Sequence, residues 1–375
     1  MDSLRIGIAC YPSLGGSGVV ATELAAGLAE RGHAVHLFTF STPHREAAGV
    51  SIHLVNVFAY PLLQFPPYDL ALASKIVDTV QRIGGLDILH VHYAVPHAIS
   101  AFLAKQMLGP KAFRTVTTLH GTDISIVGSD PAYATVTRFG IDQSDGVTAV
   151  SDSLRAQTQR LFGVRREIVT LPNFVDLKVF QPVADRADPR PTLVHASNFR
   201  PVKRAIDVVK IFAQVHRAIP DARLVLLGEG PEKDPAMALA RELGVHQSVE
   251  DRGAVQIPSN VLAQADLLLL PSETESFGLV ALEAMACGVP VLASRVGGLP
   301  EVIADGVCGR LFEVGDVNAF AMAAIDLLQD PVRRRAMGAA GRARAESEFS
   351  KERVVERYVD YYRKVIARQD AAVQP

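Results

Sequence analysis

A segment in the second half of the chain, Leu269–Glu283, combines groups that could hold a phosphorylated ligand. It runs from a buried apolar strand through a polar loop into a helix. Unpaired backbone amides at a helix start attract anions, and a carboxylate two turns further on lies on roughly the same face. We therefore expect a pyrophosphate at the helix start and the two hydroxyls of a ribose at Glu283; an exposed acidic loop that caps a helix is the alternative. The amides expected at the pyrophosphate are those of Ser276, Phe277, Gly278 and Leu279.

A second signal for anion binding lies where the first predicted strand turns into the first helix. The glycine-rich run Pro12–Gly18 allows the backbone to approach a ligand closely, although a turn of this kind needs glycine for its geometry alone. Gly16 and Gly18 supply a Gly-x-Gly, but position 21 is alanine, so the run departs from the dinucleotide-binding fingerprint. A nicotinamide-dependent dehydrogenase is therefore disfavoured.

Metal-binding patterns are weak in this sequence. It contains no Asp-x-Asp, the pair that holds a divalent ion in nucleotide-sugar enzymes of another fold, and no Cys-x-x-Cys. His90, His92 and His97 end a predicted strand and enter a loop without a cysteine or carboxylate partner. We expect no metal ion and no cofactor.

Short apolar runs alternate with amphipathic stretches along the chain, which is the pattern of parallel sheets covered by helices. In the first half, strands are expected at Arg5–Cys10, Val35–Thr39, Ile88–His92, Thr115–Leu119, Gly146–Val150 and Ile168–Leu171, and helices at Val19–Arg31, Asp69–Gly84, Ala98–Met107 and Pro131–Gln143. In the second half, strands are expected at Thr192–Ala196, Ala222–Leu227, Val249–Arg252, Leu267–Leu270 and Pro290–Ser294, and helices at Ala205–Ala218, Pro235–Leu243, Asn260–Gln264, Gly278–Cys287, Asn318–Gln329 and Pro331–Gln369. The sequence predicts an α/β protein with two doubly wound parallel sheets.

The stretch 176–191 is rich in Pro, Asp and Arg without apolar periodicity, so it is the expected linker. It separates an N-terminal domain, residues 1–175, from a C-terminal domain, residues 192–348, and residues 349–375 are expected to form a terminal helix. The last helical region also carries a basic stretch, which is expected to be a solvated helix face: Arg333, Arg334, Arg335, Arg342 and Arg344.

Composition excludes several classes of protein. The 375 residues are 49% hydrophobic and 21% charged, which argues against disorder and against a coiled coil. Lys plus Arg number 38 and Asp plus Glu number 40, so no nucleic-acid partner is expected. Three well-separated cysteines and the absence of a long apolar stretch favour a cytoplasmic protein that does not insert into a membrane.

Glu275 and Glu283, separated by seven residues, resemble the signature of glycosyltransferase family 4, whose members have the GT-B fold of two Rossmann-like domains facing across a cleft. Further places fit in order along essentially the whole chain: the Gly15–Gly18 loop, His120–Asp123, Pro172-Asn173, Asn198–Lys203 and Gly228–Pro231. Within the family, the runs His90–His97, Thr117–Ile124 and Ser197–Arg204 resemble the members that transfer N-acetylglucosamine (GlcNAc) from UDP-GlcNAc to L-malate, the first step of bacillithiol biosynthesis.

This resemblance implies a retaining, metal-independent transfer that gives GlcNAc-α-malate and UDP, by a front-face route in which a leaving phosphate oxygen helps to deprotonate the incoming hydroxyl. Lys203 would neutralise the charge on UDP, His120 would reach the sugar hydroxyls, and Glu275 would hydrogen-bond them without acting as a nucleophile. Gly16, Asn198, Arg200 and Gly228 complete the implied donor site. Asn198 stands where much of the family has Arg, a change that favours the malate branch over its inositol-phosphate relatives.

The acceptor, a dicarboxylate, needs hydrogen-bond donors and a cation. The candidates are Ser17, Tyr93, Thr118 and Arg138. Each has an alternative role, because Ser17 could cap a helix, Tyr93 could pack, Thr118 could face the core and Arg138 could be solvated.

Two other functions stay open from the sequence. One is a related UDP-sugar transferase with an inositol phosphate, polysaccharide or lipid acceptor, although no long amphipathic basic segment favours a lipid. The other is a noncatalytic nucleotide-sugar sensor, which would need Glu283 and Lys203 but not His120. The resemblance also implies that the terminal helix returns to the N-terminal domain. The segment 253–258 is expected to contact uracil. The expected partners are the small-molecule substrates alone. The oligomeric state stays open, and a homo-oligomer is possible.

Overall fold

The computed structural model describes residues 3–13, 16–43, 45, 47–58, 66–184 and 188–370, with side chains as far as residue 368. It divides the chain into two compact units. Unit 1 comprises Met1–Pro172 and Lys351–Pro375, and unit 2 comprises Asn173–Ser350. The predicted limits were residues 175, 192 and 348, so the stretch expected to be a linker falls within unit 2; its residues 185–187 and the predicted Gly15 lie outside the described residues.

Unit 1 contains a seven-stranded sheet in the order β3-β2-β1-β4-β5-β6-β7, in which every paired strand is parallel. Its strands are β1 (Arg5–Ala9), β2 (Ala34–Thr39), β3 (Val50–Leu54), β4 (Ile88–His92), β5 (Arg114–Leu119), β6 (Gly146–Ala149) and β7 (Ile168–Thr170). Its helices are α1 (Ser17–Glu30), α2 (Tyr68–Ile83), η1 (Ala94–Ala98), α3 (Ile99–Leu108), α4 (Thr122–Ser125), α5 (Pro131–Gln143), α6 (Asp152–Phe162) and α14 (Lys351–Asp370).

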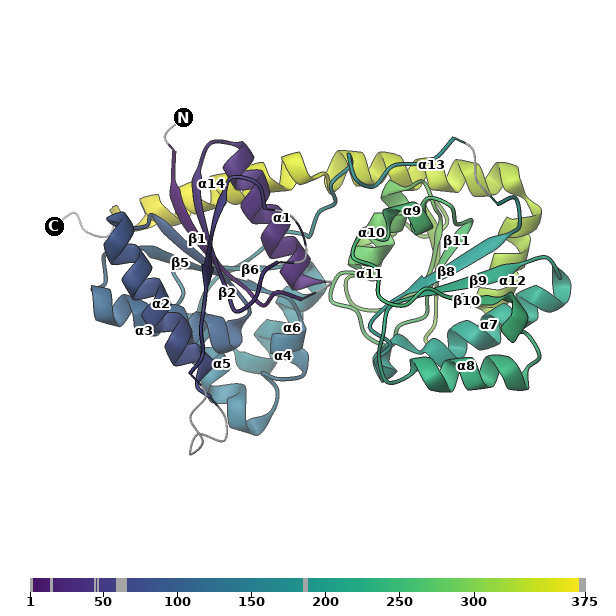
Figure 1. Cartoon of the computed structure of the whole chain (residues 1–375), viewed down its shortest axis with the longest axis horizontal. Coiled ribbons are helices and arrows are strands. Elements are labelled where there is room, and N and C mark those ends of the chain that lie inside the picture. Colours follow the sequence, from purple (N-terminus) through teal and green to yellow (C-terminus); the bar gives the residue numbers. More distant parts are fainter. Residues whose placement is uncertain are drawn as a thin grey trace. The chain divides into compact units, whose positions relative to one another are not determined.

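The terminal helix α14 is an integral part of unit 1, where it packs against α1 and β5 (Figure 1). Tyr358 and Tyr362 are fully buried, and the Tyr361 hydroxyl donates to the Val147 carbonyl oxygen over 3.1 Å. On the opposite side, α2 packs against α3, which also contacts α5. Both faces of the sheet are therefore covered by helices.

Unit 2 contains a six-stranded parallel sheet in the order β10-β9-β8-β11-β12-β13. Its strands are β8 (Thr192–Ala196), β9 (Arg223–Leu227), β10 (Val249–Asp251), β11 (Leu267–Leu270), β12 (Val291–Ser294) and β13 (Gly309–Phe312). Its helices are η2 (Pro201–Lys203), α7 (Ala205–Ala218), α8 (Lys233–Glu242), η3 (His246–Ser248), α9 (Ser259–Leu262), α10 (Leu279–Ala286), α11 (Leu299–Val302), α12 (Val317–Gln329) and α13 (Pro331–Glu348).

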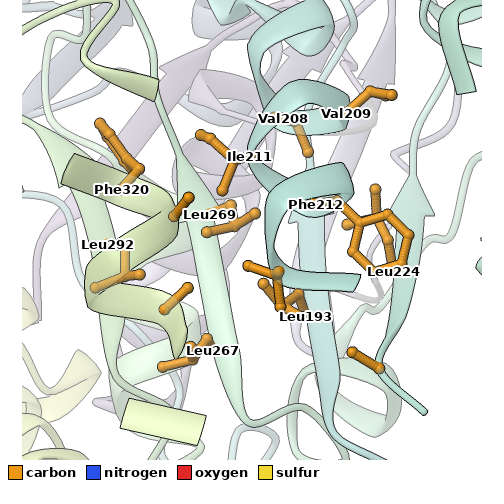
Figure 2. Packing of buried hydrophobic residues seen from close by; sticks show 14 of the residues in the cluster. Leu193, Val208, Val209, Ile211, Phe212, Leu224, Leu267, Leu269, Leu292 and Phe320 are labelled. Carbon is orange, nitrogen blue, oxygen red and sulfur yellow. The ribbon is translucent and has the colours of Figure 1, made fainter. Parts of the chain in front are cut away.

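The main core of unit 2 forms where α7 and α12 pack together on the sheet. Figure 2 shows Phe212 of α7 beside Leu193 and Leu224 of the strands. On α12, Phe320 stacks near Phe312 with ring centroids 4.6 Å apart. This apolar layer fixes β8 and β11 side by side, which is what positions the loops that follow them.

The predicted solvated face on the last helices is wrong for three of its five arginines. Arg334 pairs with Asp266 at 2.9 Å, Arg342 donates to the carbonyl oxygens of Phe180 and Ala286 over 2.7 Å each, and Arg344 donates to that of Val302 over 2.9 Å. The guanidinium groups satisfy carbonyls at the ends of other elements. The helical stretch predicted at Pro331–Gln369 is divided into two helices, α13 and α14, on either side of Phe349 and Ser350, so the terminal helix predicted for residues 349–375 is a helix of its own. None of the helices within the described residues is both long and apolar enough to cross a membrane.

Candidate functional site

In unit 2 the strand order reverses between β8 and β11, because the chain proceeds from β8 to β9 and β10 on one side and from β11 to β12 and β13 on the other. In open α/β sheets, ligands bind beyond the carboxyl ends of the strands at such a switch point. The loop after β8 carries Asn198, Arg200 and Lys203, and the loop after β11 carries Glu275. These four predicted donor-site residues thus lie at the same edge of the sheet, whereas the predicted donor residue Gly16 belongs to unit 1.

Lys203 and Glu275 form an ion pair that joins these two loops. Their side chains are 19% and 12% exposed, so the pair is largely shielded from water but still reachable. The backbone reinforces the junction, because the Glu273 amide donates to the Val202 carbonyl oxygen over 2.8 Å. A cation and a carboxylate therefore stand side by side beyond the carboxyl ends of β8 and β11.

The Glu275 loop rests on a pair of glycines that the sequence reasoning missed. The Gly298 amide donates to the Glu275 carbonyl oxygen over 3.0 Å. Gly297 has φ +52°, and a Cβ atom added to it would lie 1.8 Å from the same oxygen. Only glycine permits this approach of backbone to backbone. The signal in the sequence was the Gly-Gly pair two residues beyond the buried strand Val291–Ser294.

Helix α10 begins after Gly278, which has φ +95°, and carries Glu283 with only 8% exposure. Phe277 is a core residue whose ring packs edge-on against Phe349 at 5.9 Å, so only its backbone can line a ligand site. Ser276 and Leu279 are half-buried beside it. The positive φ of Gly278 therefore sets the backbone turn into α10, and the buried Phe277 ring holds this turn against the core.

The predicted donor residue Gly228 plays a different part. Its φ is +116°, and a Cβ atom there would lie 1.8 Å from the Ser197 carbonyl oxygen. Its amide donates to the Gly253 carbonyl oxygen over 2.7 Å, so this amide is not available to a ligand. Gly228 lets the turn after β9 pass against the turn after β8, which carries the exposed Asn198.

Lys233 is a second residue that sequence reasoning missed. It is 7% exposed, and its Nζ donates to the Gly228 carbonyl oxygen over 3.1 Å and pairs with Glu229 and Asp251 at 2.8 and 2.7 Å. Burial lowers the pKa of Lys233, but the hydrogen bonds from Asp251 and Glu229 outweigh it, and the net pKa is raised. Lys233 therefore stays charged and ties the turns after β9 and β10 together.

In unit 1 the order reverses between β1 and β4, and residues from the loops after these strands meet there. Ser17, directly after Gly16 with its φ of +62°, shares a hydrogen bond between its hydroxyl and that of Tyr93. Burial raises the pKa of Tyr93 to about 12, against the lowering effect of the Ser17 hydrogen bond. The phenol is thus a neutral hydrogen-bond donor at physiological pH.

His120 lies beside this pair, with its ring 5.3 Å from that of Tyr93. Its backbone is fixed by the buried Asp123, whose Oδ1 accepts from the amides of His120 and Gly121 over 3.1 and 2.9 Å. The other oxygen, Oδ2, accepts from the Ala94 amide over 3.0 Å. Asp123 therefore joins the loops after β4 and β5. The sequence indicated Asp123 only as the last residue of the run His120–Asp123, which follows a predicted strand.

The side chain of Thr118, a predicted acceptor residue, does not reach this site. Thr118 is fully buried, and its Oγ1 hydrogen-bonds with His90 Nε2 and Thr148 Oγ1 over 2.6 Å each. Its side chain points into the core beneath α14, so the prediction is wrong and its alternative role holds.

Arg138 lies on α5, with its Nε 3.8 Å from Asp142 Oδ2. With Arg165 and Arg166 it lines an open depression near the amino end of β7, whereas Ser17 and Tyr93 lie at the carboxyl ends of the strands. Within the described residues no printed contact joins Arg138 to Ser17 or Tyr93, and its role as the cation for the acceptor stays a prediction.

Four histidines of unit 1 are neutral because they are buried. Burial lowers the pKa of His90 and of His120 to about 3 and that of His97 to about 4, and it lowers the pKa of His92 well below its ordinary value. Burial disfavours the charged form of an imidazole, because the protein interior solvates a charge less well than water does. The unfolded chain, in contrast, protonates its histidines near pH 6.5.

Unit 1 is accordingly expected to lose stability as the pH falls from about 6.5 towards 5. Over this range the unfolded chain binds protons that the folded chain does not, so the free energy of unfolding falls by up to about 1.4 kcal/mol per pH unit for each such histidine. Urea unfolding at closely spaced pH values measures this slope. A His90→Gln variant should show a shallower slope than the parent; equal stability at pH 7 and pH 5 would contradict the neutral assignment.

Comparisons with known proteins match both units to glycosyltransferase family models. Residues 14–179 match the family model Glycosyltransferase Family 4, and residues 179–344 match Glycosyl transferases group 1. The chain is 48% identical over 374 residues to N-acetyl-alpha-D-glucosaminyl L-malate synthase of Bacillus anthracis, a match that covers 97% of each chain. It is 32% identical to D-inositol 3-phosphate glycosyltransferase of Segniliparus rotundus, over 93% of this chain and 84% of the relative.

Solved structures share the architecture. Sucrose-phosphate synthase of Thermosynechococcus elongatus superposes with a TM-score of 0.79 at 25% identity, covering 96% of this chain and 99% of that one. The Anabaena protein Alr3699/HepE, solved in complex with UDP-glucose, has a TM-score of 0.79 at 21% identity, with 99% and 100% of the chains covered.

Proposed function

Because this chain belongs to glycosyltransferase family 4 and has the GT-B fold, we propose that it transfers GlcNAc from UDP-GlcNAc to the hydroxyl of L-malate. The products are GlcNAc-α-malate and UDP, and the anomeric configuration of the sugar is retained. The observation that carries the proposal is the 48% identity to the malate synthase along 97% of both chains, against 32% to the inositol-phosphate enzyme.

Unit 2 is proposed to bind the UDP-sugar. Lys203 bears the charge that develops on the leaving diphosphate, and Glu275 hydrogen-bonds the sugar hydroxyls. The ion pair between them supports this division, because it holds both groups in place before a ligand arrives. Glu283 is proposed to hold the ribose. No metal ion takes part in this proposal, since Lys203 supplies the positive charge at the phosphate.

Unit 1 is proposed to bind malate and to bring His120 to the transferred sugar. Ser17 and Tyr93 are paired donors at the carboxyl ends of β1 and β4, and a neutral phenol is a suitable partner for a carboxylate. A cytoplasmic location is also part of the proposal, and the three free, buried cysteines support it.

Replacing Tyr93 with phenylalanine is expected to raise the KM for malate by roughly 10- to 100-fold, because a hydrogen bond to a charged group contributes about 1.5–3 kcal/mol. The affinity for UDP-GlcNAc should not change. Initial rates at varied malate concentration, with UDP-GlcNAc binding measured by calorimetry in the absence of malate, check both points. Tyr133→Phe, at an exposed position on α5, is the matched control. An unchanged KM in Tyr93→Phe would remove Tyr93 from the acceptor site.

A panel of acceptors tests the proposed function itself. UDP release from UDP-GlcNAc is measured with L-malate, D-malate, inositol 3-phosphate and glycerol phosphate in parallel. Release with L-malate alone, or at least 100-fold faster with it, is the expected result. Release with inositol phosphate only would keep the class of enzyme and exclude malate, whereas tight binding without release on any acceptor would indicate a sensor.

A further inference from the structure

A buried imidazole lies directly behind His120 in unit 1. His92, the last residue of β4, is fully buried, and its ring is nearly parallel to that of His120, with an interplanar angle of 21° and centroids 5.0 Å apart. Its Nδ1 lies 2.8 Å from His120 Nε2, which is a hydrogen bond. Its other nitrogen, Nε2, is buried and has no hydrogen-bond partner among the residues that the structure describes.

Both rings are neutral in this surrounding, because burial holds their pKa values far below neutrality. A neutral imidazole carries a single N–H, so the proton of the hydrogen bond between His92 and His120 can be bound to either ring. In the first arrangement, His92 Nδ1 donates to His120 Nε2. In the second, His120 Nε2 donates to His92 Nδ1. Each arrangement fixes the positions of the remaining protons.

The two arrangements differ in what they leave buried. In the second, the only proton of His92 sits on Nε2, as a buried N–H without an acceptor. In the first, His92 Nε2 carries no proton and presents only its lone pair. A buried donor without a partner is among the rarest features of folded proteins, and an acceptor left unpaired is tolerated more often. The contacts of His92 therefore favour the first arrangement, in which His120 carries its own proton on Nδ1.

We propose that His92 is a positioning residue that holds His120 in the Nδ1–H tautomer, so that His120 presents an N–H donor to the ligand. His120 is half-buried, and its Nδ1 has no partner within the described part of the chain, so this donor is free to bond a sugar hydroxyl or a phosphate oxygen. The consequence is that His120 does not act as a general base through this nitrogen. The inference rests on the proposed function only for the identity of the ligand.

The surroundings of His92 hold its ring in the required orientation. His97 Nδ1 hydrogen-bonds to the His92 carbonyl oxygen, which fixes the end of β4. On the other side, the ring of His90 lies 4.5 Å from that of His92 and is itself bonded on both nitrogens, to Tyr362 and Thr118. A second-layer ring that cannot rotate can determine the tautomer of the ring in front of it, as is usual for histidines at functional sites.

Nitrogen NMR of the free protein tests this assignment without any turnover. The full chain is labelled with ¹⁵N-histidine, and two-bond ¹H–¹⁵N correlations at pH 7 distinguish Nδ1–H from Nε2–H imidazoles. The signals of His120 are those lost in His120→Gln. An Nδ1–H pattern for both His120 and His92 is expected, and an Nε2–H pattern for His120 overturns the proposal whatever the enzyme's substrate is.

Variants of His92 provide a second readout. His92→Phe keeps a ring but removes the donor, so the His120 signals should shift towards the Nε2–H pattern and kcat should fall roughly 10- to 100-fold with UDP affinity unchanged. His92→Asn places an amide near the Nδ1 position and should restore at least part of both. His216→Phe, on α7 of unit 2, is the control for replacing a histidine outside the site with phenylalanine. If His92→Phe folds and keeps both the tautomer and kcat of the parent, the proposal is wrong.

Discussion

Replacing Lys203 with alanine is expected to lower kcat/KM by roughly 100- to 1,000-fold, since a single group that stabilises developing charge in a transition state contributes on this scale. Most of the loss should appear in kcat, because the charge on the leaving UDP grows as the bond breaks. The substitution also leaves Glu275, which is 12% exposed, without the cation that faces it. Steady-state kinetics with UDP-GlcNAc varied at saturating acceptor give the two parameters separately.

The control is Lys210→Ala, which removes the same charge from an exposed position on α7 where the amine lies 3.9 Å from Asp207. It should change neither parameter measurably, because exposed pairs contribute little. Lys203→Arg should recover part of kcat, since it keeps the charge but not the shape of the pair. A Lys203→Ala enzyme with nearly normal kcat would exclude Lys203 from the chemical step.

Replacing Gly297 with alanine is expected to lower kcat/KM by about 100-fold and to destabilise unit 2. The new Cβ atom would stand 1.8 Å from the Glu275 carbonyl oxygen, so the loop that carries Glu275 must shift. A misplacement of about 1 Å at a reacting group can cost a factor of about 100 in rate. Kinetics and urea unfolding on the same sample measure the two effects.

Gly306→Ala separates this collision from backbone strain. Gly306 also has a positive φ, +78°, but an added Cβ atom would meet nothing within 4 Å. Its variant should lose only about 1–2 kcal/mol of stability from the left-handed conformation, with activity close to that of the parent. Equal activity in the two variants would show that the position of the Glu275 loop does not depend on its contact with Gly297.

The elements that the sequence predicted best are the buried ones. The predicted limits of three buried strands agree with the structure: Ile88–His92, Thr192–Ala196 and Leu267–Leu270. A short apolar run between two helical patterns is typical of a buried parallel strand. The strands β3 and β13 were missed. Both lie at the edge of their sheet, and β3 is half exposed, so neither carries a continuous apolar run.

The meeting of Lys203 with Glu275 could be expected only from the family resemblance. The two residues are 72 positions apart, and their contact depends on the pairing of β8 with β11, which no local pattern reveals. The resemblance gave the residue types, and the strand order supplies the reason that they meet.

The error at Thr118 has a physical cause. Both faces of the sheet in unit 1 are covered, so alternation along β5 does not show which face of the strand is near a ligand. Thr118 bonds to His90, whose other nitrogen meets Tyr362 of α14, a helix from the far end of the chain.

The central claim is the identity of the product, and one measurement tests it directly. UDP-GlcNAc and L-malate are incubated with the protein, with and without EDTA, and the product is identified by its mass and by the proton coupling at its anomeric carbon. We predict GlcNAc-α-malate, formed at the same rate in both samples, together with one UDP per glycoside. A β-linked product, a requirement for metal, or no malate glycoside at all while another acceptor is glycosylated would contradict the account.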